Sequence, residues 1–376
     1  MTGFPTSLDN YFMGIALNLA RRGVGNVAPN PAVGCVIASA EAAPRVLGRG
    51  WTQPGGRPHA ETEALHRAGT AARGAVAYVT LEPCAHHGQT PPCAQALIDA
   101  GVSRVVAAMQ DPDPRVAGKG FALLREAGIT VQTGVCAEQA ELLNAGFLSR
   151  CRHDRPVVTL KVATTLDGRI ATHSGESRWI TGASARARTH LLRATHDAIM
   201  VGSNTALVDD PELTCRLAGL EARSPLRVIA DGRMRLPLTS KFVRSAATQP
   251  SLMFIRNDAD RLRAGAYRDA GIDVVRLPAG NDGHMQPDAM LRALGERGIN
   301  SVLVEGGAVL AATLIGADLV DRLVWFRAAK LIGGDGIAAI APLGLDHLAD
   351  SPVFLRESVA QFGEDLLETY RRRQYN

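Results

Sequence analysis

The sequence predicts an α/β protein built from two domains. A chain of 376 residues is longer than a single domain with one hydrophobic core usually is. Its residues are 46% hydrophobic and 21% charged, which is an ordinary composition for a globular protein. Short apolar runs alternate with amphipathic helical patterns along the whole chain, which predicts mixed sheets covered by helices. A polar segment ending in a proline, residues 151–156, separates two such series. We therefore expect domains at residues 1–152 and 153–376.

In the first half, a helix is predicted over residues 8–22, because it stops at Gly23, a residue common at helix C-termini. The apolar runs that follow predict strands at residues 33–37, 75–81, 104–109 and 129–132. The helical patterns lie at residues 59–68, 93–100, 121–127 and 138–148. This order predicts a sheet with helices on its faces.

The second half repeats the alternation. Strands are predicted at residues 157–162, 198–202, 226–230, 252–255, 273–276, 301–304 and 322–327, with two more near the C-terminus. Helices are predicted at residues 184–193, 258–270, 287–297 and 308–315. No G-x-G-x-x-G fingerprint follows the first strand, so the pattern does not favour a standard dinucleotide-binding Rossmann domain.

Four residues in the first half form a metal-binding pattern: His59, Glu61, Cys84 and Cys93. One imidazole and two thiolates give zinc three protein ligands and leave one tetrahedral position open, as in catalytic rather than structural sites. Glu61 is not a ligand in this interpretation and would carry protons. H-x-E followed by P-C-x-x-C is typical of zinc deaminases, although eight residues separate the cysteines here instead of the usual two. The alternative interpretation of these four residues is a closed zinc knuckle, which is a structural site.

Several other residues have two interpretations. His86 and His87, inside the loop between the cysteines, are expected to shape the loop or contact substrate, with zinc ligation as the alternative. Cys35 in an apolar strand, Asp167 in a turn and His196 before a strand are expected to be structural.

Residues 29–36 and 81–93 resemble the deaminase half of the bifunctional deaminase/reductase family of riboflavin biosynthesis. Residues 160–171, 197–202 and 304–307 resemble its reductase half, so the resemblance covers nearly the whole chain. It implies a cytidine-deaminase-like three-layer α/β domain followed by an α/β domain like dihydrofolate reductase. One position departs from the family, which has a hydroxyl residue after Asp231 as a cofactor contact, where this chain has Gly232.

The resemblance also implies the chemistry. Zn²⁺ would serve hydrolytic deamination of 2,5-diamino-6-(5-phosphoribosylamino)pyrimidin-4(3H)-one, with Glu61 as catalytic residue, and NADPH would then reduce the ribosyl group. The implied cofactor contacts are Ala163, Trp179, Thr205, Asp209, Gly307, Ala308, Val309, Leu310, Ala311, Ala312 and Thr313. The implied substrate contacts are Asn30, Lys161, Ser177, Arg193, Leu213, Arg216 and Glu305. Asn30, between two prolines, could otherwise be only a turn residue.

Charge and composition limit the remaining partners. A net charge of +4 without a basic and aromatic stripe disfavours a nucleic-acid partner, which a nucleic-acid base deaminase would need. No apolar run reaches about 18 residues, so no membrane span is expected. Six scattered cysteines and no signal peptide favour a reducing, cytoplasmic location, and we expect a homo-oligomer. A nucleotide-sensing protein with a degenerate reductase half is the other alternative.

Overall fold

The computed structural model describes residues 6–86, 91–114, 116–280 and 283–373. The chain divides into two compact units, Met1–Asp154 and Arg155–Asn376, each with its own sheet and hydrophobic core. Among the described residues, no helix is long and apolar enough to cross a bilayer.

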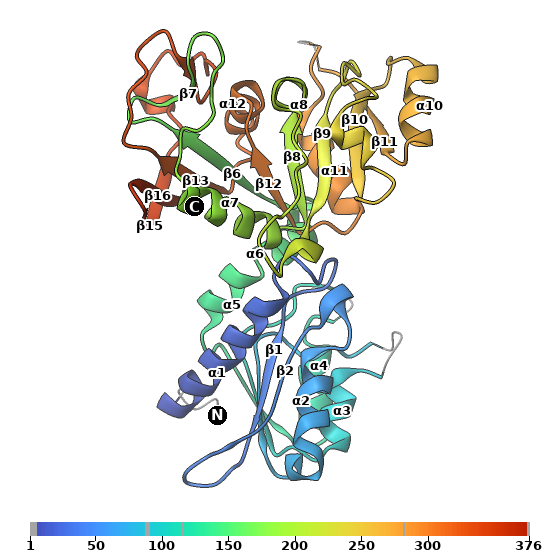
Figure 1. Ribbon diagram of the computed structural model, residues 1–376. Coiled ribbons are helices and arrows are strands. Elements are labelled where there is room, and N and C mark those ends of the chain that lie inside the picture. Colours follow the sequence, from blue (N-terminus) through green and yellow to red (C-terminus); the bar gives the residue numbers. More distant parts are fainter. Residues whose placement is uncertain (1–5, 87–90, 115, 281–282, 374–376) are drawn as a thin grey trace. The chain divides into compact units, whose positions relative to one another are not determined.

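The first unit is a three-layer α/β structure (Figure 1). Its five-stranded sheet has the order β2-β1-β3-β4-β5, with β1 antiparallel to both neighbours and β3, β4 and β5 parallel. The strands are β1 Gly34–Ala38, β2 Val46–Trp51, β3 Val76–Val79, β4 Arg104–Ala107 and β5 Thr130–Thr133. Helices α1 (Ser7–Ala20) and α5 (Ala137–Leu143) cover one face. Helices α2 (Ala60–Ala68), α3 (Cys93–Asp99) and α4 (Lys119–Glu126) cover the other.

Strand β2 was not predicted, because glycines interrupt its apolar pattern. The same glycines let helix α2 pack closely on the sheet. A Cβ on Gly48 would lie 2.1 Å from the carbonyl oxygen of Ala64, and one on Gly50 would lie 2.1 Å from that of Ala60. The first turn of α2, which carries the predicted proton shuttle, is therefore fixed against β2.

The end of the first unit differs from the prediction. The helix expected over residues 138–148 is two helices, α5 and α6 (Ala145–His153), which meet at Asn144. The expected linker is also shorter, since residues 151–153 form the last turn of α6, and Asp154 ends the helix in a left-handed conformation. A string of polar residues after a helix does not by itself end that helix, because such residues are compatible with its exposed face.

The second unit contains a nine-stranded sheet of order β11-β10-β9-β8-β12-β6-β13-β16-β15 (Figure 1). The strands β11, β10, β9, β8, β12, β6 and β13 are parallel to one another, whereas β16 and β15 form an antiparallel hairpin that pairs with β13 through β16. Strands β7 and β14 pair separately. The strands are β6 Val157–Thr164, β7 Arg169–Ala171, β8 Ala198–Gly202, β9 Leu226–Ala230, β10 Ser251–Arg256, β11 Asp273–Leu277, β12 Ser301–Glu305, β13 Arg322–Arg327, β14 Ile337–Ala338, β15 Phe354–Phe362 and β16 Asp365–Arg372.

The helices of this unit connect its parallel strands. They are α7 Ala183–Ala194, α8 Ser203–Asp209, α9 Lys241–Arg244, α10 Arg261–Asp269, α11 Pro287–Glu296 and α12 Ala308–Gly316. Helix α8 follows β8 directly and α12 follows β12, so both begin at the carboxyl edge of the parallel strands, where open α/β sheets bind ligands. The predicted strands of this half are confirmed, while the short helices α8 and α9 were missed because they hold too few residues to show a period.

Candidate functional site

Three predicted zinc ligands lie together in the first unit. The side-chain donor atoms of His59, Cys84 and Cys93 all lie within 4.8 Å of one another. His59 is the N-cap of α2 rather than its first residue, and Cys93 is the first residue of α3, as predicted. Cys84 lies in the loop after β3, which stops at Val79, two residues before the predicted end of that strand.

The distances within this group fit a tetrahedral zinc ion. Nδ1 of His59 is 3.3 Å from Sγ of Cys93 and 3.7 Å from Sγ of Cys84. Zinc bonds of about 2.0 Å to nitrogen and about 2.3 Å to sulfur at a tetrahedral angle would place these atoms about 3.5 Å apart. The backbone N–H of Cys93 also donates to Sγ of Cys84 at 3.3 Å, which supports the charge of a thiolate. Among the described residues, this is the one cluster of His, Cys, Asp or Glu with metal-binding spacing; His87 lies outside them.

The electrostatics of the group favour a proton carrier beside a thiolate. Hydrogen bonding from Cys93 lowers the pKa of Cys84 to about 4, and the thiolate of Cys84 in turn holds the pKa of Cys93 well above its usual range. Glu61 is 4% exposed, and burial raises its pKa to about 7. A carboxyl group that titrates near neutral pH both accepts and donates protons readily.

A buried carboxylate that was not predicted shapes the wall beside the cysteines. Glu82, two residues before Cys84, accepts hydrogen bonds from the backbone N–H groups of Asp111, Gly118, Gly120 and Phe121 at 2.9–3.2 Å. The loop between β4 and α4 is thereby closed onto the cysteine loop. In the sequence, Glu82 is recognisable only as a charged residue in an otherwise apolar run, which does not indicate which backbone groups it contacts.

Asn30 lies in a loop near the metal ligands. Its Nδ2 donates to the carbonyl oxygen of Gly56 at 2.8 Å, three residues before His59. Gly56 has φ 85°, and a Cβ there would lie 2.3 Å from Nδ2 of Asn30, so the contact needs glycine. Asn144, buried at the junction of α5 and α6, fixes the same loop. It accepts from the N–H of Ala32 at 2.9 Å and donates to the Ala32 carbonyl at 3.1 Å.

In the second unit, the predicted substrate residues meet around a buried ion pair. Arg193 of α7 donates to both carboxylate oxygens of Glu305 at 2.7 and 2.9 Å and to the carbonyl of Thr214 at 2.9 Å. Lys161 of β6 lies opposite Glu305 in the parallel ladder, and burial lowers its pKa. Burial alone would raise the pKa of Glu305, but the charge and hydrogen bonds of Arg193, together with the charge of Lys161, lower that pKa. A carboxylate and two cations are thus held at the end of β12.

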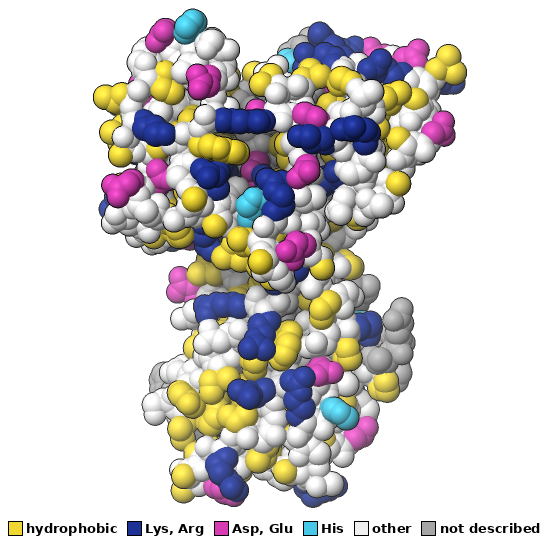
Figure 2. All heavy atoms as spheres, in the orientation of Figure 1, with side chains coloured by type: hydrophobic (Ala, Val, Ile, Leu, Met, Phe, Trp, Pro, Cys, Tyr) yellow, Lys and Arg dark blue, Asp and Glu magenta, His cyan; other side chains and the backbone are white. Residues whose placement is uncertain are grey.

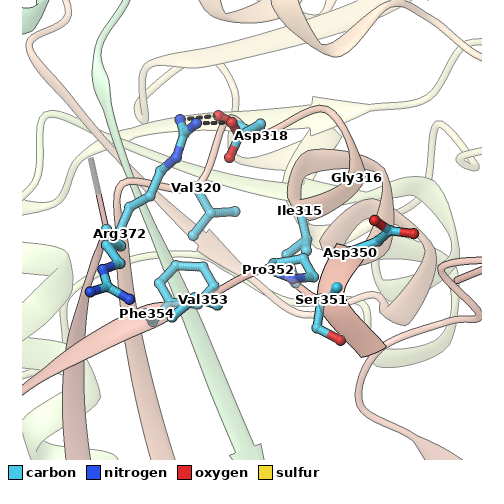
Figure 3. Close-up of a pocket in the computed structure, with 12 residues that line it drawn as sticks. Ile315, Gly316, Asp318, Val320, Asp350, Ser351, Pro352, Val353, Phe354 and Arg372 are labelled. Carbon is cyan, nitrogen blue, oxygen red and sulfur yellow. Dashed lines mark hydrogen bonds and ion pairs between the residues drawn. The ribbon is translucent and has the colours of Figure 1, made fainter. Parts of the chain in front are cut away.

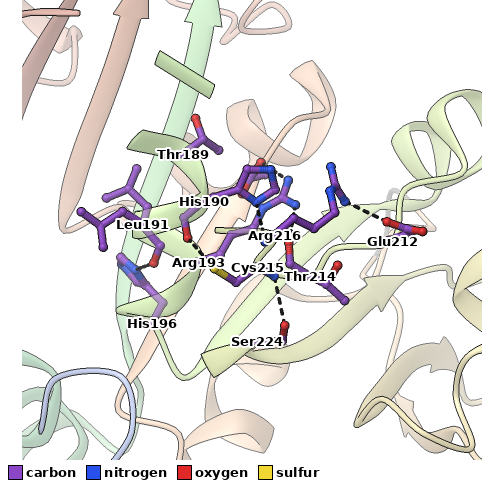
Figure 4. Close-up of polar contacts among 12 residues, drawn as sticks. Thr189, His190, Leu191, Arg193, His196, Glu212, Thr214, Cys215, Arg216 and Ser224 are labelled. Atoms are coloured by element: carbon purple, nitrogen blue, oxygen red, sulfur yellow. Dashed lines mark hydrogen bonds and ion pairs between the residues drawn. The ribbon is translucent and has the colours of Figure 1, made fainter. Parts of the chain in front are cut away.

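The loop that follows α8 is tied to α7 by contacts that were not predicted (Figure 4). Nδ1 of His190 accepts from the backbone N–H of Arg216 at 3.3 Å, and the His190 carbonyl accepts from the thiol of Cys215 at 3.3 Å. Arg216 pairs with Glu212 at 2.9 Å and remains half exposed. Leu213 is only 2% exposed, so contact with a ligand would have to come from its backbone.

The predicted cofactor residues are grouped around the start of α12. Gly306 and Gly307 have φ of 84° and 89°, which favours glycine, and Thr205 of α8 packs against them. The segment from Gly307 to Thr313 is the N-cap and first part of α12. Leu310 and Ala311 point into the core at 8% and 3% exposure, so the exposed part of the segment is its beginning.

The other predicted residues lie at the edge of this group. Trp179 is 61% exposed, and the guanidinium of Arg186 lies 4.5 Å from its ring centroid. The carbonyl of Asp209 accepts from Arg178, and burial raises the pKa of its carboxyl group. Ala163 and Ser177 are half-buried.

The structural interpretations of three residues are confirmed. Cys35 is fully buried in the apolar core. His196 donates from Nδ1 to the Leu192 carbonyl at 2.7 Å, and its Nε2 lies 3.0 Å from the Thr159 hydroxyl. Asp167 holds a turn by accepting from Thr165 and from the N–H of Gly333.

A separate hollow of about 230 Å³ in the second unit contains none of the predicted residues (Figure 3). It lies between the end of α12 and the chain around β15 and β16, and Arg372 at its rim is held by Asp318. Its lining offers no cluster of groups for catalysis.

Comparisons with known proteins match both units. Residues 6–109 match the family described as the cytidine and deoxycytidylate deaminase zinc-binding region, and residues 156–367 match the RibD C-terminal domain family. Riboflavin biosynthesis protein RibD of Escherichia coli (strain K12) is 42% identical over 369 residues, which cover 95% of this chain and 98% of the relative. The solved structure of Acinetobacter baumannii RibD is similar with a TM-score of 0.88 at 38% identity, covering 97% of this chain and 99% of the other. A diaminohydroxyphosphoribosylaminopyrimidine deaminase/5-amino-6-(5-phosphoribosylamino)uracil reductase from Thermotoga maritima gives a TM-score of 0.84 at 34% identity, with coverage of 97% and 99%.

Proposed function

The chain belongs to the RibD family of bifunctional deaminase/reductases of riboflavin biosynthesis, and from this premise we propose which of its residues perform the two reactions. It is a zinc-dependent deaminase and an NADPH-dependent reductase, with a cytidine-deaminase-like fold followed by one like dihydrofolate reductase. It deaminates 2,5-diamino-6-(5-phosphoribosylamino)pyrimidin-4(3H)-one and reduces the ribosyl group to give 5-amino-6-(5-phosphoribitylamino)uracil. The family match over both halves excludes the two alternative classes, the nucleic-acid base deaminase and the degenerate nucleotide sensor.

For deamination, we propose that His59, Cys84 and Cys93 hold the zinc. When bound, zinc lowers the pKa of water from about 15.7 towards 7 and so supplies a nucleophile at neutral pH. Glu61 takes up the proton of that water and later gives it to the departing ammonia. The observation that supports this role is a buried carboxyl group, with a pKa raised to about 7, beside all three ligands. Asn30 orients the pyrimidine from the neighbouring loop.

The decisive test is Glu61→Gln, which keeps the shape of the side chain and removes its ability to exchange a proton. We expect ammonia release to fall by at least a hundredfold, because general acid–base catalysis contributes about 10²–10⁴. Zinc content and NADPH oxidation with the deaminated substrate should be unchanged. If deamination survives in this variant, the proton-carrier role is wrong.

For reduction, we propose that the exposed beginning of the segment from Gly307 to Thr313 binds the pyrophosphate of NADPH through backbone N–H groups. Paired left-handed glycines allow that close approach, and the helix dipole of α12 favours the anion. Arg193 and Arg216 supply the guanidinium groups for the ribose phosphate, while Lys161, Glu305 and Asp209 are the polar groups near the reacting sugar. Arg216→Ala should raise KM for the phosphorylated intermediate about tenfold with little change in kcat. An unchanged KM would remove Arg216 from the site.

We also propose the finer points that depend on the whole molecule. The deaminase activity is assigned to residues 1–152 and the reductase to residues 153–376. The boundary between the two compact units falls between Asp154 and Arg155 in the sequence, which supports this assignment to within a few residues. Free thiolates at the metal require a reducing compartment, which supports a cytoplasmic location. We further propose a homo-oligomer, which light scattering on the purified chain would test.

A further inference from the structure

The segment that follows α8 carries two of the proposed substrate residues, Leu213 and Arg216, without regular secondary structure. Residues 210–216, which we call the substrate segment, form neither a helix nor a strand. Asp210 and Leu213 have φ of 39° and 57°, in the left-handed region. Backbone groups that no ladder satisfies need other partners, and left-handed residues persist only where their surroundings hold them. Side chains of neighbouring elements therefore fix the conformation of this segment.

Two arginines hold the beginning and the middle of the substrate segment. The guanidinium of Arg227, which is buried at the start of β9, donates to the Glu212 carbonyl at 3.2 Å. Arg193 of α7 donates to the Thr214 carbonyl at 2.9 Å. Neither of these two hydrogen bonds reaches the last residue of the segment, whose guanidinium is proposed to bind the ribose phosphate.

His190 holds the end of the segment (Figure 4). It lies on α7 three residues before Arg193, so the two side chains leave the same face of the helix. Nδ1 of His190 accepts from the backbone N–H of Arg216 at 3.3 Å, and its carbonyl accepts from the thiol of Cys215 at 3.3 Å. One residue of α7 therefore holds two consecutive residues of the substrate segment.

Only a neutral imidazole makes the contact with Arg216, because both ring nitrogens of an imidazolium are donors. The charged groups around the ring are Arg193 on its own helix, Arg216 on the segment and Glu305 at the end of β12. Glu212 is paired with Arg216 at 2.9 Å. Burial and the two guanidinium groups lower the pKa of His190, and the carboxylate of Glu305 opposes them. The ring is therefore neutral at pH 7, and acidification would remove the acceptor.

The surroundings of the substrate segment suit a phosphorylated ligand. Figure 2 shows Lys and Arg side chains gathered on the face of the second unit over α7 and the strands beside it. Arg216 is half exposed, so its guanidinium is accessible while its backbone N–H is held by His190. Binding of phosphate through two parallel hydrogen bonds requires a particular direction of the guanidinium fork. Fixing that direction before the ligand arrives lowers the entropic cost of binding.

We propose that His190 is a positioning residue of the reductase, whose neutral imidazole fixes the backbone of Arg216 so that the guanidinium meets the ribose phosphate. The inference rests on the proposed role of Arg216. It implies that the affinity for the phosphorylated intermediate depends on His190, whereas hydride transfer does not. It also implies that protonation of this ring weakens binding in acid, in addition to protonation of the phosphate itself, whose second pKa is about 6.

The test measures KM and kcat for reduction of the deaminated intermediate by the full chain with saturating NADPH. His190→Leu removes the acceptor and should raise KM about fivefold at pH 7.5, as expected for one hydrogen bond, with kcat within about twofold of the wild type. His190→Gln keeps an acceptor oxygen without a titratable proton, so its KM at pH 7.5 should stay within about twofold of the wild type. His347→Gln, which changes an exposed histidine of the same unit, is the matched control and should change neither parameter.

Two comparisons separate a positioning role from a merely structural one. Between pH 7.5 and 5.5, KM should rise more in the wild type than in His190→Gln, by a further factor of about two to five, because only the wild type loses its acceptor. His190→Leu combined with Arg216→Ala should raise KM no more than Arg216→Ala alone, because His190 acts through Arg216. The pH comparison needs only His190→Gln, so it decides the question even if His190→Leu does not fold.

The outcomes separate this inference from the proposed function. If Arg216→Ala raises KM while both His190 variants behave like the wild type at both pH values, the positioning role is wrong and the proposed function stands. If the two single effects add in the double variant, His190 acts on the fold or on another group, and the inference is again wrong. A wild-type KM that falls in acid relative to that of His190→Gln would mean that the imidazolium binds the phosphate directly, which also overturns it. If Arg216→Ala leaves KM unchanged, the role of Arg216 falls and this inference falls with it.

Discussion

Asn144 offers a sharp test of how the first unit positions its site. Its side-chain amide exchanges two hydrogen bonds with the backbone of Ala32, at 2.9 and 3.1 Å, as a neighbouring strand would. It thereby fixes the loop that carries Asn30. Asn144 and Ala32 are 3% and 5% exposed, so water does not replace these bonds readily. Substitution with alanine would leave one buried N–H and one buried C=O without their partner.

The expected cost follows from those two groups. An unsatisfied buried polar group costs about 1–3 kcal/mol, so Asn144→Ala should destabilise the loop by about 2–6 kcal/mol. Partial entry of water would place the result near the lower limit. For a domain of about 150 residues, 2 kcal/mol lowers the melting temperature by about 4–8 °C. We also expect kcat/KM for deamination to fall at least tenfold, because Asn30 loses its fixed position.

Amide hydrogen exchange at Ala32 measures the local free energy directly, and an ammonia-release assay measures the functional effect. The reductase activity of the same protein serves as an internal control and should be unchanged. Gln95→Ala, which removes an exposed amide on α3, should change stability by less than about 0.5 kcal/mol. Unchanged exchange at Ala32 together with normal deamination would show that the two hydrogen bonds do not hold this loop.

Three further predictions concern charge and metal. Burial lowers the pKa of His196 to about 4, below its unfolded value of about 6.5. The free energy of unfolding should therefore decrease as pH falls from 6.5 to 4, by at most about 3 kcal/mol. Urea unfolding at pH 7 and 4.5 measures this decrease, and an equal pH dependence in His196→Gln would contradict the prediction. Glu305→Gln should cost about 3 kcal/mol, because Arg193 loses its buried counter-charge, and a variant as stable as the wild type would refute that value. Removal of zinc by a chelator should abolish deamination but not reduction of the deaminated intermediate, and parallel loss of both would mean that the metal supports the whole fold.

Much of the second unit was predictable because its strands are buried on both faces. Such strands read as continuous apolar runs, as in Val302, Leu303 and Val304, and they are recognisable without knowledge of their neighbours. Strand β2 was missed for the opposite reason. Its glycines at 48 and 50 are required by helix α2, which packs on them from elsewhere in the chain.

The candidate site divides in the same way. The proposed metal ligands were readable because zinc requires particular donor atoms, and His59, Cys84 and Cys93 of the motif have donor atoms that lie together in the structure. The residues that hold those groups in place were not readable. Glu82 acts on backbone N–H groups 29–39 residues away, and Asn144 acts on one 112 residues away. Backbone N–H groups are the same at every residue, so only the folded chain decides which of them a buried side chain meets.

The sequence by itself therefore determined the two α/β halves, the candidate zinc ligands and the chemistry that these residues and the family motifs imply. Only the tertiary structure decided that Leu213 turns into the core, that Arg193 and Glu305 pair, and that His190 meets Arg216. The physical reason is that donor chemistry and hydrophobic period are properties of single residues and short segments. Burial and partnership depend on which distant segments pack together.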